Sequence, residues 1–202
     1  MKKIAADVAL LLPEKINKIC IDINRKKDAK AYSDLSRKNN HPHITLAMGV
    51  IDEKDIPAAS SKLKAIANKF SKLSLVITKI ASQITPEKKK HFYFFVKPTG
   101  EVVKLHSEIM KKISPYFSYK SSLSMFYRDS DEVLKEVSRY WVDNYARNHK
   151  NPSDYHPHIS LKAVKADYDE KFPIRFTASK IALCQLGNYC TCRTILASAN
   201  LH

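Results

Sequence analysis

The hexapeptide HPHITL at residues 41–46 is repeated almost identically as HPHISL at residues 156–161, so each half of the 202-residue chain carries one copy. The copies differ only where one hydroxyl residue replaces another. Each copy is typical of the start of a β-strand, and side chains alternate between the two faces of a strand. The histidines and the hydroxyl of each copy therefore share one face, while the proline, isoleucine and leucine share the other. The repeat predicts two strands that each present a polar face backed by apolar core.

Hydrophobic patterning outside the repeat predicts a mixed order of strands and helices. We expect strands at 4–12, 42–51, 73–81, 92–96, 157–164, 172–186 and 190–199, and helices at 13–27, 55–70, 101–113 and 131–148. This order lacks strict β-α alternation, which favours an α+β fold with largely antiparallel sheets. The length fits one large domain, and no Pro-, Gly- or Ser-rich linker divides it, so residues 1–202 are predicted to form a single domain.

The composition excludes several classes of function. The three glycines cannot form a glycine-rich phosphate-binding loop. No apolar run reaches the roughly 18–20 residues that span a bilayer, so no membrane partner is expected. The N-terminus imitates a signal peptide, but Asp7 interrupts its apolar stretch and no cleavage site follows. We expect a cytoplasmic protein whose four cysteines are reduced thiols.

The charge balance points to an anionic partner. Lysine and arginine total 35 against 20 acidic residues, which gives a net charge of +15. Such a surplus attracts polyanions, among which nucleic acid is the commonest. RNA or a nucleotide is therefore the expected partner. No stable protein partner is evident, and we expect a monomer.

The polar faces of the repeat carry His43 and Thr45 in the first copy, and His158 and Ser160 in the second. Cleavage of a phosphodiester needs a base for the nucleophile and an acid for the leaving oxygen, and imidazole can serve as either near neutral pH. The two hydroxyls can donate to the non-bridging oxygens, where negative charge must be held. We interpret these four residues as catalytic, in a scheme that needs no metal and no cofactor.

A metal site is the alternative interpretation of the same residues. His-x-His on a strand is a familiar ligand spacing, and imidazole binds zinc well. Neither copy contains a carboxylate or a cysteine, however, and Asp154 is the only acid close by in the sequence. This difference favours metal-independent acid-base chemistry.

Two His-x-[Ser/Thr] motifs, one in each half, resemble the 2H phosphoesterase superfamily and especially its 2′-5′ RNA ligase or RNA cyclic phosphodiesterase branch. DVALLLP at 7–13, AMGV at 47–50 and IALCQLG at 181–187 also resemble that branch. The resemblance implies a bilobal, pseudo-two-fold α+β fold, in which two largely antiparallel sheets flanked by helices surround a central groove. It also implies that the two motifs occupy opposite walls of that groove.

The resemblance further implies hydrolysis of 2′,3′-cyclic phosphates at RNA ends or on nucleotides, with 2′-5′ ligation as the reverse reaction. Two alternatives stay open. One is an esterase for another phosphodiester, such as a 2′-5′ linkage. The other is a protein that binds RNA or nucleotides without turnover.

Further residues are predicted to surround the substrate. His41 and His156 precede the motif histidines and are expected to line the groove. Tyr155 and Tyr189 are candidates for stacking on a base, and Arg193 for pairing with phosphate. Three other positions are predicted to lie outside the site: His91 and Lys162 on the surface and His106 in a structural role.

Overall fold

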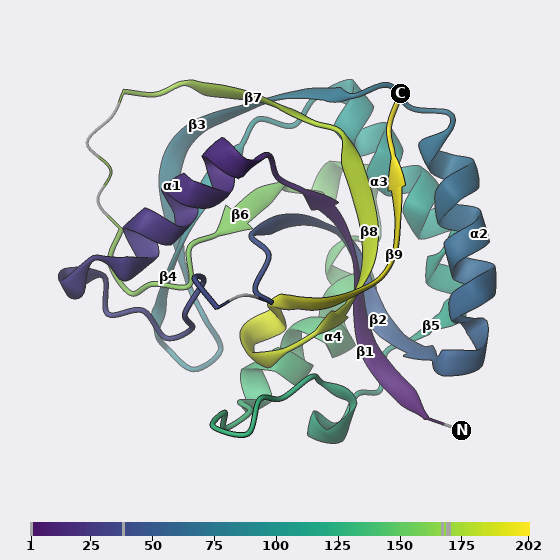
Figure 1. The fold of residues 1–202 in the computed structure, drawn as a ribbon, viewed down its shortest axis with the longest axis horizontal. Helices are drawn as coiled ribbons and strands as arrows, with labels where there is room; N and C mark the ends of the chain where they lie inside the picture. The colour runs from purple at the N-terminus through teal and green to yellow at the C-terminus, as the bar shows by residue number, and fades with distance from the viewer. Residues whose placement is uncertain (1, 38, 167, 169–170) are drawn as a thin grey trace.

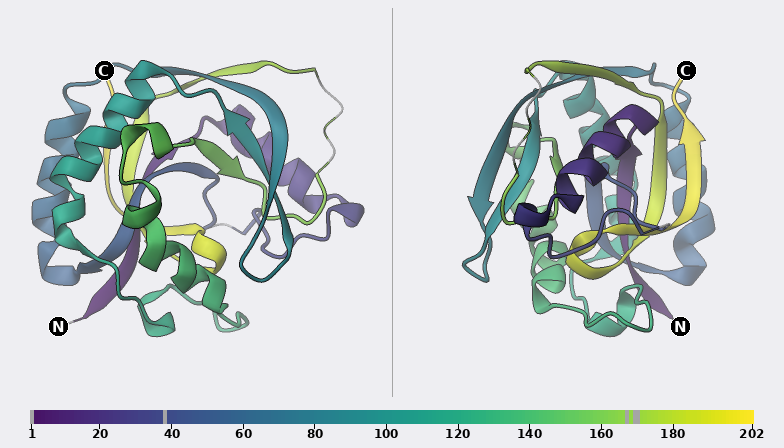
Figure 2. Two further views of the ribbon diagram at one scale, coloured as in Figure 1. Left: turned by 180° about the vertical axis from the view of Figure 1, so that it is seen from behind. Right: turned by 60° about the vertical axis from the view of Figure 1, so that its left-hand side comes forward.

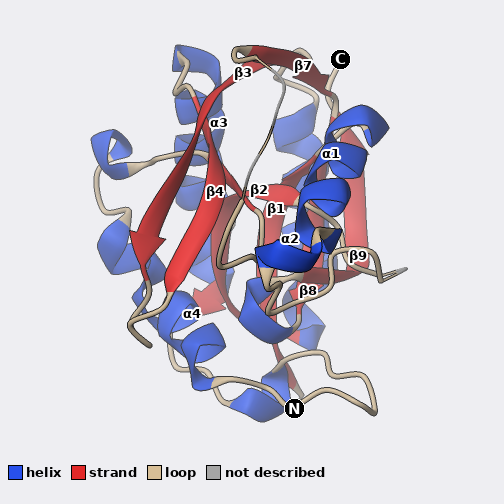
Figure 3. Cartoon of the chain, turned by 90° about the vertical axis from the view of Figure 1, so that its left-hand side faces the viewer, coloured by secondary structure: helices blue, strands red, loops and turns tan. Residues whose placement is uncertain are grey.

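Two antiparallel sheets and four α-helices make up the computed structural model, which describes residues 2–37, 39–166, 168 and 171–202. The first sheet has the strand order β5-β2-β1-β8-β9, and the second has the order β6-β4-β3-β7. Every strand pairing between the named strands is antiparallel, as the sequence predicts. Figure 1 shows the ribbon, and Figure 3 shows β3 and β4 standing apart from β1, β8 and β9.

The strands of the first sheet are β1 Lys3–Leu11, β2 His43–Asp52, β5 Phe117–Ser118, β8 Lys180–Leu186 and β9 Cys192–Asn200. Those of the second sheet are β3 Leu73–Ile84, β4 Lys90–Val96, β6 His158–Ser160 and β7 Ile174–Ala178. The helices are α1 Glu14–Arg25, α2 Ile56–Ala67, α3 Gly100–Lys112 and α4 Glu136–Asn148. None of the described helices is both long and apolar enough to cross a bilayer.

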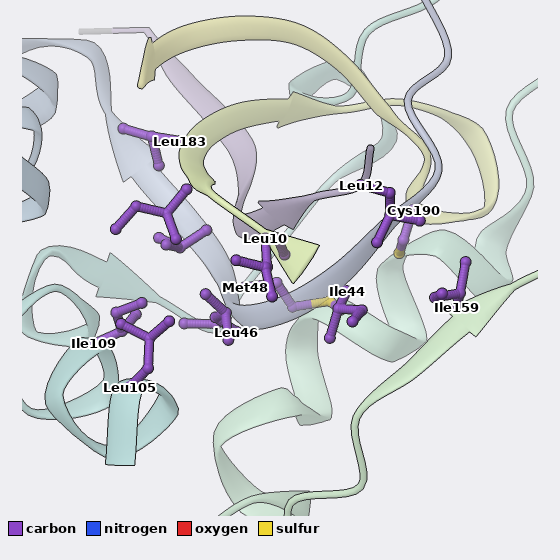
Figure 4. Close-up of a cluster of buried hydrophobic side chains, with 14 of the residues drawn as sticks. Leu10, Leu12, Ile44, Leu46, Met48, Leu105, Ile109, Ile159, Leu183 and Cys190 are labelled. Carbon is purple, nitrogen blue, oxygen red and sulfur yellow. The ribbon is translucent and has the colours of Figure 1, made fainter. Parts of the chain in front are cut away.

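The first motif opens β2 and the second motif forms β6, so each sheet carries one copy. Alternation along β2 sends Ile44 and Leu46 into the core, where both are fully buried. Leu105 and Ile109 of α3 belong to the same buried cluster, which Figure 4 shows. Helices α2 and α3 pack against the first sheet and each other (Figure 2). The apolar face of the motif thus fixes the direction in which its polar face points.

Three predicted elements end differently in the structure. Helix α4 begins at Glu136 instead of residue 131, and Val133 is exposed, because residues 129–132 form a turn closed by the Glu132 amide on the Asp129 carbonyl. The predicted strand at 157–164 stops at Ser160. Lys162 has a φ of 50°, which is incompatible with a strand.

The predicted strand at 172–186 is two strands of different sheets. β7 pairs with β3 in the second sheet, and β8 pairs with β1 and β9 in the first. The break falls at Ser179, whose carbonyl accepts from the Leu201 amide. Both halves contain enough apolar side chains to suit a strand, so the sequence does not indicate the crossing.

Candidate active site

A cavity of about 520 Å³ brings the two motifs together. Its walls include His43 and Thr45 from the first motif, and His156, His158 and Ser160 from the second. Sites for small molecules typically measure about 300–1,000 Å³, so a nucleotide-sized ligand fits this volume. One cavity lined by an imidazole and a hydroxyl from each motif agrees with the groove that the resemblance implies.

Both motif histidines are held in the same way. Nδ1 of His43 lies 2.8 Å from the carbonyl oxygen of His41, and Nδ1 of His158 lies 3.0 Å from that of His156. A carbonyl oxygen only accepts, so Nδ1 carries a hydrogen in both rings. This fixes the ring orientations and leaves Nε2 as the nitrogen for chemistry. The contribution of His41 and His156 to this arrangement is a backbone carbonyl.

The two motifs have different surroundings. The first motif, with His43 and Thr45, contacts the carboxylate of Asp7. Its Oδ2 lies 3.1 Å from Nε2 of His43 and accepts a 2.8 Å hydrogen bond from the Thr45 hydroxyl. Asp7 comes from β1 and is fully buried. An ionised carboxylate only accepts, so protonation of Nε2 makes this contact an ion pair. In that state the first motif offers a proton for transfer.

This contact also modifies the role expected of Thr45. Its hydroxyl hydrogen points to Asp7, so in this arrangement only its lone pairs are free. Donation to a phosphoryl oxygen requires the hydroxyl to rotate away from Asp7.

His158 lies in the opposite electrostatic environment. Burial, reinforced by the charges of Lys162 and His43, lowers the pKa of His158 to about 4. The Lys162 side chain is buried and donates a 2.5 Å hydrogen bond to the Tyr189 carbonyl. His158 is consequently neutral at pH 7, and with Nδ1 protonated its Nε2 offers a lone pair. The second motif holds a proton acceptor.

Ser160 is the end of a hydrogen-bonded chain. Its Oγ lies 3.1 Å from Nε2 of His91, whose Nδ1 contacts the hydroxyl of Tyr32. Burial and the nearby Lys162 charge lower the pKa of His91 to about 3, so this ring is neutral and donates through only one nitrogen. When Tyr32 donates to Nδ1, Nε2 donates to Ser160. The Ser160 hydrogen is then free for a phosphoryl oxygen.

A β-bulge shapes the wall beneath the first motif. The register between β1 and β2 shifts between Val8 and Ala9, which leaves Leu46 as the extra residue. Side chains satisfy the backbone there: the Tyr155 hydroxyl donates to the Thr45 carbonyl at 2.9 Å, and Nδ1 of His106 donates to the Leu46 carbonyl at 2.7 Å. Bulges commonly re-aim side chains next to functional sites. His106 has the structural position that the sequence predicts.

The predicted substrate-binding residues divide into two groups. His156 lies exposed on the cavity wall, and Tyr189 lines the cavity with its ring 4.7 Å from that of Tyr32. The other three predictions need correction. His41 borders a small adjoining cavity. Tyr155 lines the main cavity as predicted, but its buried ring is already stacked on His106, with 3.9 Å between the ring centroids, and is not free to stack on a base.

Arg193 is the third correction, because the cavity walls do not include it. The residue is 2% exposed, and its guanidinium pairs with Asp129 and Glu132. A cation so neutralised and enclosed is not available to phosphate.

Several residues of the site were missed or misplaced by the sequence reasoning. His91 and Lys162, predicted on the surface, are both buried in the cavity wall. Strand alternation could have placed His91 at the site. His91 lies on the same face of β4 as Tyr93 and Phe95, and these two residues pair with Ser160 and His158 of the second motif. Tyr32 carries no local signal, and the only signal of Asp7 is that it interrupts an apolar stretch. Tyr32 comes from the loop after α1, where its amide donates to the Lys162 carbonyl at 3.0 Å.

One cluster in the site has the composition of a metal site. Asp7, His43 and Cys192 each offer a ligand atom, and these atoms lie within 4.8 Å of one another. The sequence separates these residues widely, which is why the motifs alone showed neither a carboxylate nor a thiol. The fold supplies both to the first motif.

Comparisons with known proteins agree with this architecture. Solved structures of the same fold include Escherichia coli LigT complexed with NADP+, at 14% identity over 99% of each chain and a TM-score of 0.59. TT0787 of Thermus thermophilus matches at 14% identity over 98% of each chain with a TM-score of 0.61. A structure described as a phosphoesterase matches at 14% identity over 99% of each chain with a TM-score of 0.54. A search of curated proteins gave no match.

The family is assigned from the sequence. The family model described as the 2′-5′ RNA ligase superfamily matches residues 16–189, which include both motifs. The fold agrees, with two antiparallel sheets, flanking helices and one motif on each sheet. The chain therefore belongs to the 2′-5′ RNA ligase superfamily.

Proposed function

We propose that this protein is a phosphoesterase that opens 2′,3′-cyclic phosphates at RNA ends or on nucleotides, without a metal. The observation that carries the proposal is the pair of imidazoles on the walls of one cavity, each with Nδ1 bound to a backbone carbonyl. Membership of the superfamily supports this class of activity. The net charge of +15 suits an anionic substrate.

The unequal surroundings of the two histidines support different roles for them. His158, neutral and with a free Nε2, takes a proton from water as the water oxygen bonds to phosphorus. The bond from phosphorus to one ribose oxygen breaks, and that oxygen takes the proton held between His43 and Asp7. The product is a ribose phosphate monoester. Proton exchange with solvent then returns both histidines to their starting states.

The remaining groups stabilise charge on the phosphoryl oxygens. Ser160, with its hydrogen free, donates to a non-bridging oxygen, and Thr45 does so after turning from Asp7. Lys162 supplies positive charge behind the second motif, although burial lowers the pKa of its amine. Tyr32 and Tyr189 form an aromatic edge on which a base can stack.

The same groups serve ligation, because a 5′-hydroxyl can replace water as the nucleophile that gives its proton to His158. The 5′ oxygen then bonds to phosphorus, and the departing ribose oxygen takes its proton from His43. Water is far more concentrated than RNA ends, so hydrolysis is the expected net direction. A 2′-5′ linkage is the alternative substrate within the same chemistry.

A substrate panel tests the proposal. Purified protein is incubated with the four 2′,3′-cyclic mononucleotides, a short RNA ending in a cyclic phosphate and a 2′-5′-linked dinucleotide, each with wild type and with His158→Ala. We expect wild type alone to open the cyclic phosphates. Cleavage of only the 2′-5′ dinucleotide would mean that the substrate is a 2′-5′ linkage and not a cyclic phosphate. Binding without turnover of any member would favour a binding protein and refute the enzymatic proposal.

A further inference from the structure

One face of the first sheet carries sulfur, nitrogen and oxygen ligands close to the catalytic candidate His43. Asp7 on β1 pairs with Met48 of β2 on one side and Cys184 of β8 on the other. Cys192 begins β9 and is fully buried, and its thiol is hydrogen-bonded with that of Cys184. The carboxylate, the imidazole and the thiols therefore meet on one face of four neighbouring strands.

The spacing of these ligand atoms suits a tetrahedral ion. Zinc binds nitrogen and oxygen at about 2.0–2.2 Å and sulfur at about 2.3 Å, which puts tetrahedral ligand atoms about 3.3–3.6 Å apart. Nε2 of His43 and Oδ2 of Asp7 are already 3.1 Å apart, and the Cys192 thiol lies within 4.8 Å of both residues' ligand atoms. Small side-chain movements bring all three to bonding distance.

A second observation is independent of that spacing. Oδ1 of Asp7 is buried and has no hydrogen-bond partner in the described structure. A buried carboxylate oxygen without a partner costs free energy that a ligand can recover. His43 lines the main cavity, so an ion can reach the cluster through the substrate space.

We propose that Asp7, His43 and Cys192 form an inhibitory site for a thiophilic divalent cation of the zinc type. The ion bonds to Nε2 of His43, to the Asp7 carboxylate and to the Cys192 sulfur, which releases its proton to solvent. Nε2 cannot hold a metal and a transferable proton together. Metal binding and general-acid catalysis by His43 are therefore mutually exclusive, and the inhibitory effect rests on the proposed function.

Cadmium titration tests the site without reference to activity. Binding to a cysteine produces a sulfur-to-cadmium charge-transfer absorption in the ultraviolet. We expect wild type to show this absorption at one ion per chain, and Cys192→Ser to lose it. Cys20→Ala is the matched control, because Cys20 is a buried thiol in α1, outside the cluster, and should leave the absorption unchanged. Absence of the absorption in wild type, or its persistence in Cys192→Ser, would overturn the site.

Inhibition is measured separately, on the hydrolysis of a cyclic mononucleotide. We expect zinc to inhibit wild type, and Cys192→Ser to need at least about tenfold more zinc for the same inhibition. A chelator should leave metal-free wild type fully active and restore the inhibited enzyme. Equal zinc sensitivity of wild type and Cys192→Ser would mean that zinc inhibits by binding elsewhere. That result would overturn the inhibitory role of the proposed site. If no cyclic phosphate is hydrolysed but the cadmium absorption depends on Cys192, the proposed function fails while the metal site stands.

Discussion

Replacing Asp7 with Asn removes the charge that faces His43 and Thr45 while nearly preserving the shape of the side chain. The substitution weakens the 3.1 Å contact between Oδ2 of Asp7 and Nε2 of His43. The Asp7 carboxylate is fully buried, and the His43 side chain is 8% exposed. Hydrogen bonds that involve a charged group contribute about 1.5–3 kcal/mol. If that stabilisation supports the proton-donating state of His43, kcat/KM should fall by about 10- to 150-fold, since each 1.36 kcal/mol is a factor of ten.

The assay is steady-state hydrolysis of a 2′,3′-cyclic mononucleotide by wild type, Asp7→Asn, His43→Ala and the double variant. The effect of Asp7→Asn should disappear in the His43→Ala background, because the carboxylate then has no imidazole to act through. Asp55→Asn, at the N-cap position of α2 and outside the cavity walls, is the control and should keep full activity. A circular dichroism melt of each variant checks that the fold persists.

Two results would refute the reasoning. Full activity of a folded Asp7→Asn variant would show that the carboxylate does not support catalysis. An equal loss from Asp7→Asn with and without His43 would show that the carboxylate acts on something other than this imidazole.

Three further predictions follow from the same geometry. His43→Ala and His158→Ala should each lose about 10²–10⁴-fold in kcat/KM, and the double variant less than the product, as measured by hydrolysis kinetics; near-full activity of either folded single variant contradicts its assignment. Tyr32→Phe should lower kcat/KM severalfold, an effect that vanishes in a Ser160→Ala background, because the tyrosine acts through His91 on that hydroxyl. Binding of an oligonucleotide ending in a cyclic phosphate should weaken steeply with salt and that of a mononucleotide much less; equal slopes would mean that the lysine surplus does not guide RNA.

The parts of the fold that were predictable are those where local pattern and burial agree. The repeated hexapeptide could be placed on strands with the correct face inward, because strand alternation is a local property and both apolar faces are in fact buried. The crossing between β7 and β8 could not be predicted. Residues on both sides of Ser179 suit a strand equally well, and tertiary pairing alone decides which sheet each half joins.

The candidate site shows the same division. His43, Thr45, His158 and Ser160 could be chosen from sequence because two matched copies are improbable by chance. Asp7 could not, since it lies in an apolar stretch where its only sequence signal is the interruption. Arg193 was mistaken for a phosphate ligand because its neutralising partners, Asp129 and Glu132, are distant in the sequence and arrive only with the fold.

The low pKa of His158 leads to a prediction about how bound substrate changes that pKa. His158 loses its proton as pH rises through its pKa, so a base of this kind gives a rate that falls as pH drops through that value. In the free enzyme the pKa is about 4, depressed by burial and by positive neighbours, and kcat/KM should hold until roughly that pH. A bound phosphate brings a negative charge, and an opposite charge at close range favours the imidazolium by about 1–3 units.

The acid limb of kcat, which reports the enzyme–substrate complex, should therefore lie at higher pH than the acid limb of kcat/KM. Full pH profiles of both parameters on a cyclic mononucleotide measure the separation. Coincident limbs would mean that the substrate charge does not reach His158. An acid limb of kcat/KM at the ordinary histidine value near 6.5 would mean that the base is not the half-buried imidazole of the second motif. In the predicted case the phosphate itself makes His158 more basic, so this base takes up a proton most readily when there is substrate to attack.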